Sequence, residues 1–431
     1  MAAATGELVV LIHCGGMLWV RELSARARAA GAGVAVVTGA GGRDAVAALA
    51  DRVVEVPDPT DVAAVTGAVR ELAAGAEVSA VLSANDAGVV VAAQVSQRLG
   101  LVRTPAEPIA VARNKYLTRQ RLAAAGLPVP GYAVLGPGDE AGPVAAAVGL
   151  PAVVKPVCGT ASHEVHVVHT EAELAAAAQQ VLTRLPQGPL RGFYQGALAD
   201  AAGGLDPTAT VLVEGRLSGR EYCVDVIIRD GDITQFGLVD KFLIDERFFE
   251  LGFASPPFDL PAQRQRDLQQ CVDRAVRAIG LDNTMAHVEV IDDSRLGPTI
   301  VEINPGRPAG QAPLLLNAMV TGVDAFAELL AVHRGAPPLR RPAAATTPLA
   351  ALWIFPSGTG RVRAVHGFDE LADHPDVVLV QPTVAPGDLV SDEIEAALAV
   401  VMVGGFADRE ELTGTYYELA SLLKVDLDPS G

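Results

Sequence analysis

Apolar runs of strand length alternate with helix-like segments through the first hundred residues, and this alternation constrains the fold more than any other feature. The predicted strands are residues 7–13, 34–38, 53–56 and 78–83, and the predicted helices are 18–30, 45–50 and 61–74. Strands that alternate with helices form parallel sheets whose faces the helices cover. The glycines at 39–42 lack the last glycine of a GxGxxG sequence, so we assign them to turns. We therefore expect an N-terminal α/β domain built on a parallel sheet.

The pattern changes after a helix predicted over residues 114–125. Strand-like runs then come in neighbouring pairs, 152–155 with 165–169 and 211–214 with 221–228, followed by runs at 233–239, 287–291 and 299–303. Short links between successive strands favour antiparallel pairing, so we expect the middle of the chain to be α+β. We expect a long loop at residues 186–207, a linker at residues 335–348 and a terminal helix at residues 408–423.

The composition of the chain excludes several classes of function. Half of the residues are apolar, which excludes a disordered chain. The 33 Lys and Arg against 51 Asp and Glu give a net charge of -18, which argues against a nucleic-acid-binding face. The four cysteines are scattered, no apolar run reaches the ~18 residues of a membrane helix, and the first residues lack the features of a signal peptide. We expect a reduced, cytoplasmic protein that binds neither nucleic acid nor membrane.

Two lysines are candidates for binding a phosphate. Lys155 ends an apolar strand, and the small residues that follow, including Gly159, Thr160 and Ser162, can form a turn that exposes backbone N–H groups to an anion. The alternative is a plain hairpin with a surface lysine. Lys115 lies early in a predicted helix, where a solvated surface charge is the alternative interpretation.

The segment from Glu214 to Glu221 links two predicted strands. The backbone N–H and C=O groups of such a link, at Gly215 and Leu217 for example, can pair with the edge of a purine. Glu221 opens the next strand and can accept hydrogen bonds from a ribose diol. The alternative is an ordinary turn with two exposed acids.

Glu289 and Glu302 lie thirteen residues apart on two neighbouring predicted strands. Strand alternation places Glu302 and Asn304 on the same face. Buried carboxylates are costly unless they are paired or bind a metal, and two carboxylates with an amide oxygen suit Mg²⁺. A pair of edge-strand acids facing water is the alternative, which the apolar residues around them disfavour.

Taken in their order along the chain, these motifs resemble those of the ATP-grasp superfamily. The resemblance extends from Leu8 to about Leu427. The sequences that carry the resemblance are RNKYLTRQRLAAAGLPVP, VVKPVCGTAS, VEGRLSGREY, VDKF, AHVEVI and VEINPGRPAG. The glutamate spacing of the last two is similar to that of D-alanine–D-alanine ligase and its relatives. The His-x-Glu sequence and a Lys-Phe-rich segment are most similar to the L-amino acid (dipeptide) ligases.

The resemblance implies an ATP-grasp fold that binds ATP with Mg²⁺, or with Mn²⁺ in its place. The implied nucleotide-binding residues are Lys115, Lys155, Gly159, Thr160, Ser162, Glu214, Gly215, Leu217 and Glu221. The lysines would hold the phosphates, the backbone of 214–217 would meet adenine, and Glu221 would meet the ribose. The implied metal ligands are Glu289, Glu302 and Asn304. The implied catalytic residues are Lys241, which would reach the transferred phosphoryl group, and Arg307 and His287, which would face the substrate carboxylate and the acyl-phosphate.

The resemblance also implies a domain division. Residues 1–105 would form the parallel α/β domain, 106–213 the central subdomain with the glycine-rich loop, 214–335 the subdomain with the metal site, and 345–431 a C-terminal α+β subdomain.

The implied activity joins a carboxylate, expected to be that of an amino acid, to an amine through an acyl-phosphate, with release of ADP and phosphate. The expected partners are these two small molecules and a second copy in a homodimer. An ATP-grasp enzyme with another acceptor, such as a bicarbonate-activating carboxylase or a purine-pathway ligase, is the alternative. A non-catalytic ATP-binding protein is a further alternative.

Several positions depart from the family pattern. His163 and Glu164 follow Ser162 where a glycine is usual, and Arg307 lies five residues after Glu302 instead of four. The segment 250–253 lacks a histidine that relatives often have after its glycine. Two further residue assignments favour structural roles: Cys158 is expected to be a small loop residue, and Asn85 or Asp86 a helix cap.

Overall fold

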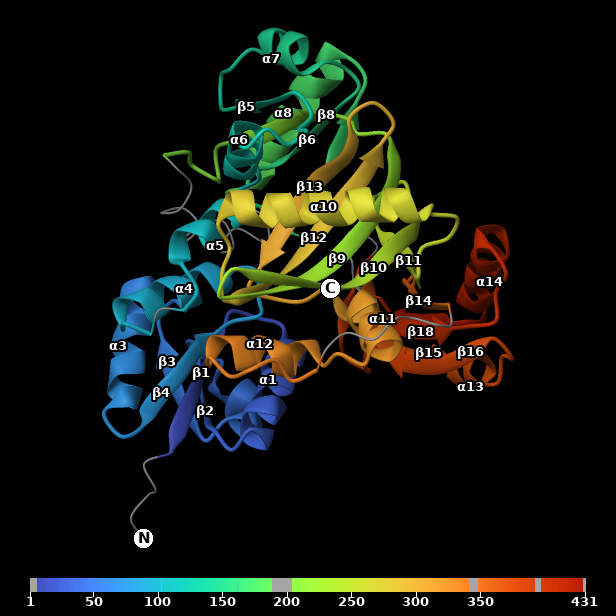
Figure 1. Cartoon of the computed structure of the whole chain (residues 1–431). Coiled ribbons are helices and arrows are strands. Elements are labelled where there is room, and N and C mark those ends of the chain that lie inside the picture. Colours follow the sequence, from blue (N-terminus) through green and yellow to red (C-terminus); the bar gives the residue numbers. More distant parts are fainter. Residues whose placement is uncertain are drawn as a thin grey trace.

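The computed structural model describes residues 6–101, 103–160, 162–187, 204–340, 348–391 and 397–428. Most of the loop expected at 186–207 and half of the linker expected at 335–348 lie outside the described residues. Within the described ranges the chain forms four β-sheets covered by helices (Figure 1). The N-terminal sheet lies at the bottom of that view, a small sheet at the top, and an eight-stranded sheet between them.

The N-terminal sheet is parallel, as the sequence predicts. Its strand order is β3-β2-β1-β4, and its strands are β1 (Glu7–His13), β2 (Gly33–Gly39), β3 (Arg52–Val56) and β4 (Glu77–Leu82). The helices of this region are α1 (Met17–Ala29), α2 (Arg43–Val46), the 3-10 turn Ala47–Leu49, α3 (Val62–Ala73) and α4 (Val89–Arg98). Successive side chains of a strand point to opposite faces, so Val10 joins a core with α3 while Val9 and Leu11 join a second core with α1.

The second core receives a helix from far along the chain. Helix α12 (Ala325–His333) packs beside α1, and the ring centroids of Trp19 and Phe326 lie 5.2 Å apart (Figure 1). Leu329 on the same helix is fully buried in this core. The N-terminal sheet is therefore covered on one face partly by residues some three hundred positions away.

The eight-stranded sheet is antiparallel throughout and reaches into the C-terminal region. Its strands, in spatial order, are β13 (Gly297–Pro305), β12 (Thr284–Asp293), β9 (Gly219–Arg229), β10 (Asp232–Ile244), β11 (Glu250–Ser255), β14 (Leu349–Ile354), β18 (Ala399–Val403) and β16 (Val377–Pro382). The β9–β10 turn forms at an Asp-Gly sequence, where Asp230 and Gly231 have φ angles of 50° and 81°. Both positive angles suit a two-residue hairpin turn.

The small sheet is also antiparallel, with the order β5-β8-β6-β7. Its strands are β5 (Tyr132–Leu135), β8 (Val211–Gly215), β6 (Ala152–Pro156) and β7 (His166–Val168), and its helices are α7 (Ala141–Val148) and α8 (Glu171–Arg184). The expected pairing of 152–155 with 165–169 is confirmed as β6 with β7.

The expected pairing of 211–214 with 221–228 is wrong, because β8 and β9 belong to different sheets. The residues that link β8 to β9 form hydrogen bonds with both sheets. Arg216 N donates to Pro151 O at the small sheet, whereas Ser218 N donates to Asp293 Oδ2 at the large sheet. The short link carries the chain from one sheet to the other instead of reversing it.

The remaining elements connect or flank these sheets. They are α5 (Ala106–Arg113), α6 (Lys115–Ala124), α10 (Ala262–Ile279), α11 (Gln311–Thr321), α13 (Phe368–Ala372), α14 (Arg409–Leu422), and a third antiparallel sheet of β17 (Leu389–Val390), β15 (Gly360–His366) and β19 (Lys424–Asp428). The terminal helix forms where it is expected, with Asp408 as its cap. Among the described residues, no single helix is long and apolar enough for a membrane span. In the same residues, α11 and α12 together have that length and apolar character, but a 92° bend separates them.

The packing of α12 against the N-terminal domain predicts that alanine substitutions at two leucines will have unequal effects on the free energy of unfolding. Leu329→Ala should lower the free energy of unfolding by about 2–5 kcal/mol, because it empties a filled core position. Leu339→Ala, at a side chain that is 60% exposed, should change it by less than about 0.5 kcal/mol. Urea unfolding followed by circular dichroism measures both, and equal losses would contradict the described packing.

Candidate functional site

A cavity of about 720 Å³ lies between the small sheet and the eight-stranded sheet. This volume is within the range of small-molecule sites. Every residue that the sequence analysis assigned to nucleotide binding, metal binding or catalysis lines it: Lys115, Lys155, Gly159, Thr160, Ser162, Glu214, Gly215, Leu217, Glu221, Lys241, His287, Glu289, Glu302, Asn304 and Arg307. The fold thus collects these residues in one place, although they come from both sheets and from helix α6.

Strands β12 and β13 place the candidate metal ligands opposite one another. Glu289 is the direct partner of Glu302 across the antiparallel pair, and His287 is the partner of Asn304. Directly opposed side chains have Cβ atoms about 4.5–5.5 Å apart. Two carboxylates and an amide oxygen on facing strands are hard oxygen donors, so this set fits a divalent cation such as Mg²⁺.

Basic side chains form hydrogen bonds and ion pairs with these oxygens. Lys115 Nζ lies 2.9 Å from Glu302 Oε1, and Arg113 Nη1 donates to Asn304 Oδ1 at 2.6 Å. The Arg113 side chain is fully buried and also lies 3.6 Å from Glu302. The sequence analysis missed Arg113; its position two residues before Lys115 was the available signal.

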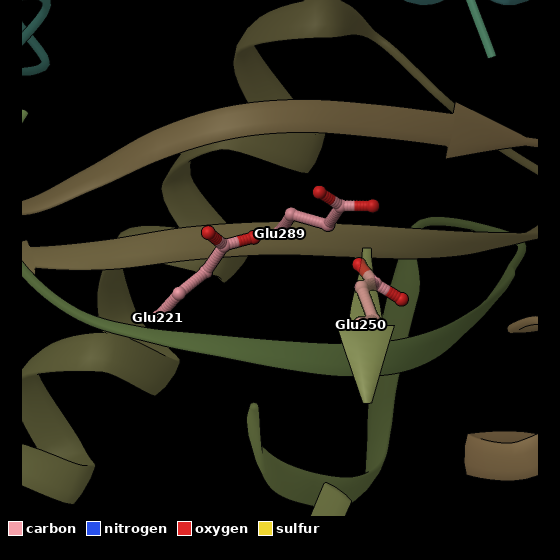
Figure 2. A group of neighbouring side chains, drawn as sticks. All are labelled: Glu221, Glu250 and Glu289. Carbon is pink, nitrogen blue, oxygen red and sulfur yellow. The ribbon is translucent and has the colours of Figure 1, made fainter. Parts of the chain in front are cut away.

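The carboxylates of Glu221, Glu250 and Glu289 lie close together (Figure 2). Lys241 forms an ion pair with each of them. Its Nζ is 2.6 Å from Glu221 and 3.0 Å from Glu289, and it also contacts Glu250. One oxygen from each acid lies within 4.8 Å of the others. Burial alone would lower the pKa of Lys241, but Glu221, Glu250 and Glu289 outweigh burial and hold that pKa well above its ordinary value. Lys241 is therefore a fixed cation in the cavity, and Glu250 is a partner that the sequence analysis did not identify.

A second buried ion pair holds Lys155. Its Nζ lies 2.5 Å from Glu214 Oε2, and Arg119 Nε lies 2.5 Å from the other oxygen of the same acid. Burial alone would raise the pKa of Glu214, but Arg119 and Lys155 outweigh burial and bring that pKa to about 2. Arg119 lies four residues after Lys115 on α6, so the two share one face of the helix. Arg119 was also missed from the sequence.

The loop after Lys155 is fastened to three parts of the protein; residue 161 lies outside the described residues. Thr160 Oγ1 donates to Asp86 Oδ2 at 2.7 Å, in the N-terminal domain. Ser162 Oγ donates to Phe248 O at 3.2 Å, between β10 and β11. Lys115 Nζ donates to Gly159 O at 3.2 Å. The described residues of the loop therefore line the cavity and are hydrogen-bonded to three parts of the protein.

The expectation that Asn85 or Asp86 caps a helix is wrong. Helix α4 begins at Val89 with Gly88 as its N-cap and no side-chain cap. Asn85 forms a local turn by accepting from Ala87 N, and Asp86 instead binds Arg307, with Nε at 2.5 Å. A buried carboxylate gains more from a guanidinium group than from a neutral N–H.

The contact of Arg307 with the cavity is retained despite its shifted spacing. Strand β13 ends at Pro305, and the next residue, Gly306, has a φ angle of 78°. Gly306 N donates to Met285 O at 2.7 Å, so the extra residue is absorbed in a turn at the strand end. A Cβ atom on Gly306 would come within 3.0 Å of Val89, so the turn requires glycine.

Two other side chains complete the description of the site. His287 Nδ1 lies 2.8 Å from Asp225 Oδ1, and its Nε2 lies 3.9 Å from Glu289. Cys158 is fully buried, and burial raises the pKa of its thiol to about 11. A buried, protonated thiol is a poor nucleophile, in agreement with its expected role as a small loop residue.

Comparison with known proteins defines the class of this fold and site. Residues 148–313 match the family model described as "ATP-grasp domain", and residues 352–428 match "L-amino acid ligase C-terminal domain 2". The crystal structure of L-amino acid ligase from Bacillus licheniformis covers 99% of this chain and 100% of its own, with a TM-score of 0.79 and 19% identity. The fold is therefore the ATP-grasp fold, with an N-terminal parallel sheet and a mixed C-terminal region.

Two curated proteins are also similar to the chain. The uncharacterized protein y4rH of Sinorhizobium fredii (strain NBRC 101917 / NGR234) is 29% identical over 77% of the chain and 64% of its own length. A D-alanine--D-alanine ligase of Aromatoleum aromaticum (strain DSM 19018 / LMG 30748 / EbN1) is 29% identical over 52% of the chain and 66% of its own length. The chain spans less than two thirds of the length of either relative. The matches to an ATP-grasp domain and to an L-amino acid ligase C-terminal domain confirm the resemblance inferred from the motifs.

The ion pairs of Glu214 predict a dependence of stability on pH. Its pKa is about 2 in the fold against an ordinary value of 4.5, so the stabilisation is present above pH 4.5 and is lost as the pH falls toward 2. The free energy of unfolding, relative to that of Glu214→Gln, should fall by up to about 3 kcal/mol over this window. Urea unfolding at a series of pH values measures the difference. The exposed variant Glu370→Gln is the control, and a difference that is constant with pH would contradict the assignment.

Proposed function

We propose that this protein is an ADP-forming carboxylate–amine ligase. The observation that carries the proposal is the register of β12 and β13, which puts Glu289 opposite Glu302, with Asn304 beside them, in a cavity rich in fixed cations. This arrangement suits a triphosphate with its divalent cation, because it supplies both hard oxygen donors and positive charge.

Different residues of the cavity would serve different parts of phosphoryl transfer. Mg²⁺ held by Glu289, Glu302 and Asn304 would supply charge stabilisation at the β- and γ-phosphates. Lys115 and Lys155 would bind phosphate oxygens in exchange for their present carboxylate partners. Glu221 and the backbone of 214–217 would hold the nucleoside. These roles rest on the cavity lining and on the match to the ATP-grasp domain.

Lys241, Arg307 and His287 lie where the chemistry would take place. A substrate carboxylate oxygen would attack the γ-phosphorus, ADP would leave, and an acyl-phosphate would form. An amine would then attack the carbonyl carbon, phosphate would leave, and the nitrogen would lose a proton. Lys241 and Arg307 would offset the charge that develops in the first step. The loop after Lys155, through Thr160 and Ser162, would exclude water from the acyl-phosphate.

An amino acid is the proposed source of both the carboxylate and the amine. The support is the match of residues 352–428 to the L-amino acid ligase domain and the similarity to a D-alanine--D-alanine ligase. A carboxylase-like or purine-pathway-like acceptor is the competing choice within the same chemistry. A non-catalytic ATP-binding role is disfavoured, because the candidate lysines and metal acids all line the cavity.

The metal assignment predicts the effect of one substitution. Glu302→Ala should abolish ATP-dependent ligation while the protein stays folded, because it removes one of the two facing carboxylates that are proposed to hold the metal. Phosphate release measures turnover and circular dichroism measures folding. Glu370→Ala, at an exposed glutamate, is the matched control. Wild-type turnover in the Glu302 variant would sink the metal assignment.

The proposed chemistry also predicts its products. A screen of amino acids, singly and in pairs, with Mg-ATP should yield ADP and phosphate in equal amounts with the new amide. Chromatography of the nucleotides distinguishes this result from release of AMP and pyrophosphate, which would require a different reaction. Turnover with bicarbonate in place of the amino-acid carboxylate would support the competing carboxylase-like reaction.

A further inference from the structure

Asp225 is a buried carboxylate beneath the cavity that the proposed reaction leaves unassigned. It lies on β9, is 1% exposed, and is the direct cross-strand partner of His287 on β12. Among the described residues, the ion-pair partner recorded for it within 4.0 Å is His287 alone. A buried acid with so little compensating charge is costly. An apolar residue would fill the same space at lower cost if packing were its purpose.

The Asp225 carboxylate accepts three hydrogen bonds. His287 Nδ1 lies 2.8 Å from Oδ1, Ala309 N donates to the same oxygen at 3.1 Å, and Asn317 Nδ2 donates to Oδ2 at 2.9 Å. An ionised carboxylate can only accept, so the proton between it and the ring resides on Nδ1 of His287. In the neutral ring, Nε2 then carries the lone pair. His287 lines the cavity, and its Nε2 lies 3.9 Å from Glu289.

The same carboxylate also holds the turn that carries Arg307. Ala309 lies two residues after Arg307, and Asn317 belongs to α11, the helix that follows this turn. One buried group therefore connects the imidazole ring, the turn after β13 and the first helix beyond it. The carboxylate thus contacts His287 directly and the turn of Arg307 through the backbone of Ala309.

We propose that Asp225 is a positioning residue, which fixes His287 as its Nδ1-protonated tautomer with Nε2 toward the substrate and anchors the turn that carries Arg307. The kinetic part of this inference rests on the proposed ligase function, whereas the tautomer of His287 does not. Asp225 acts through these neighbours and contacts no substrate itself.

The tautomer can be measured in the wild-type protein without any substrate. Histidine labelled with ¹⁵N, in long-range ¹H–¹⁵N spectra at a pH where the rings are neutral, reports which nitrogen carries the proton. The chain has eight histidines, and the signal that disappears in His287→Gln assigns the ring. We expect the Nδ1-protonated form. An Nε2-protonated ring would overturn the proposal, even if no variant of Asp225 folds.

Asp225→Asn tests the consequence for turnover. The new amide can be accommodated, because Asn317 Oδ1 has no hydrogen-bond partner among the described residues and can turn to accept from it. Loss of the orienting carboxylate should lower kcat at least about 100-fold, by analogy with other Asp–His pairs. The KM for ATP should stay within about threefold, because the phosphate-binding lysines are untouched. The His287 signal should show a mixture of tautomers.

Asn317→Ala is the matched control for a purely structural role. It removes one hydrogen bond from Asp225 but leaves the contact with His287, so the Tm should fall while kcat stays within about threefold. Equal losses of kcat in the two variants, or full kcat in Asp225→Asn, would overturn the proposal. If the wild-type protein turns over no carboxylate–amine pair, the ligase function fails, and the spectra still decide the role of Asp225.

Discussion

The opposition of Glu289 and Glu302 across two antiparallel strands is the constraint on which the rest of the site depends. Two largely buried acids that face each other across the edge strand β13 and its neighbour β12 would repel each other and resist burial. The protein meets this cost by surrounding them with cations from other elements, with Lys115 on Glu302 and Lys241 on Glu289. A chain with a net charge of -18 thus builds a cavity in which acids and bases are closely matched.

These cations come from separate parts of the chain, so the site exists only when the parts are assembled. Helix α6 supplies Lys115 and Arg119, the small sheet supplies Lys155, and the large sheet supplies Lys241. The N-terminal domain contributes Asp86, which binds both Arg307 and the loop at Thr160.

Sequence patterns that span only a few residues were sufficient to predict much of the fold and many of the residues that line the cavity. The parallel N-terminal sheet, the β9–β10 turn and the face shared by Glu302 and Asn304 follow from alternation and turn chemistry within a few residues. The pairing of β8 with β9 was wrong, because a three-residue link can either reverse a strand or pass it to another sheet. Hydrogen bonds to Pro151 and Asp293, distant in sequence, decide between these outcomes.

The sequence by itself determined which residues are candidates for holding a nucleotide and a metal, because strand period, small-residue turns and residue chemistry are local properties. Only the tertiary structure decided their partners: Asp86 on Arg307, Arg113 on Asn304, and Asp225 beneath His287. The two residues in these contacts are separated by 62 to 221 positions along the chain. Which distant groups meet depends on the packing of whole sheets and helices, and no spacing within a motif records it.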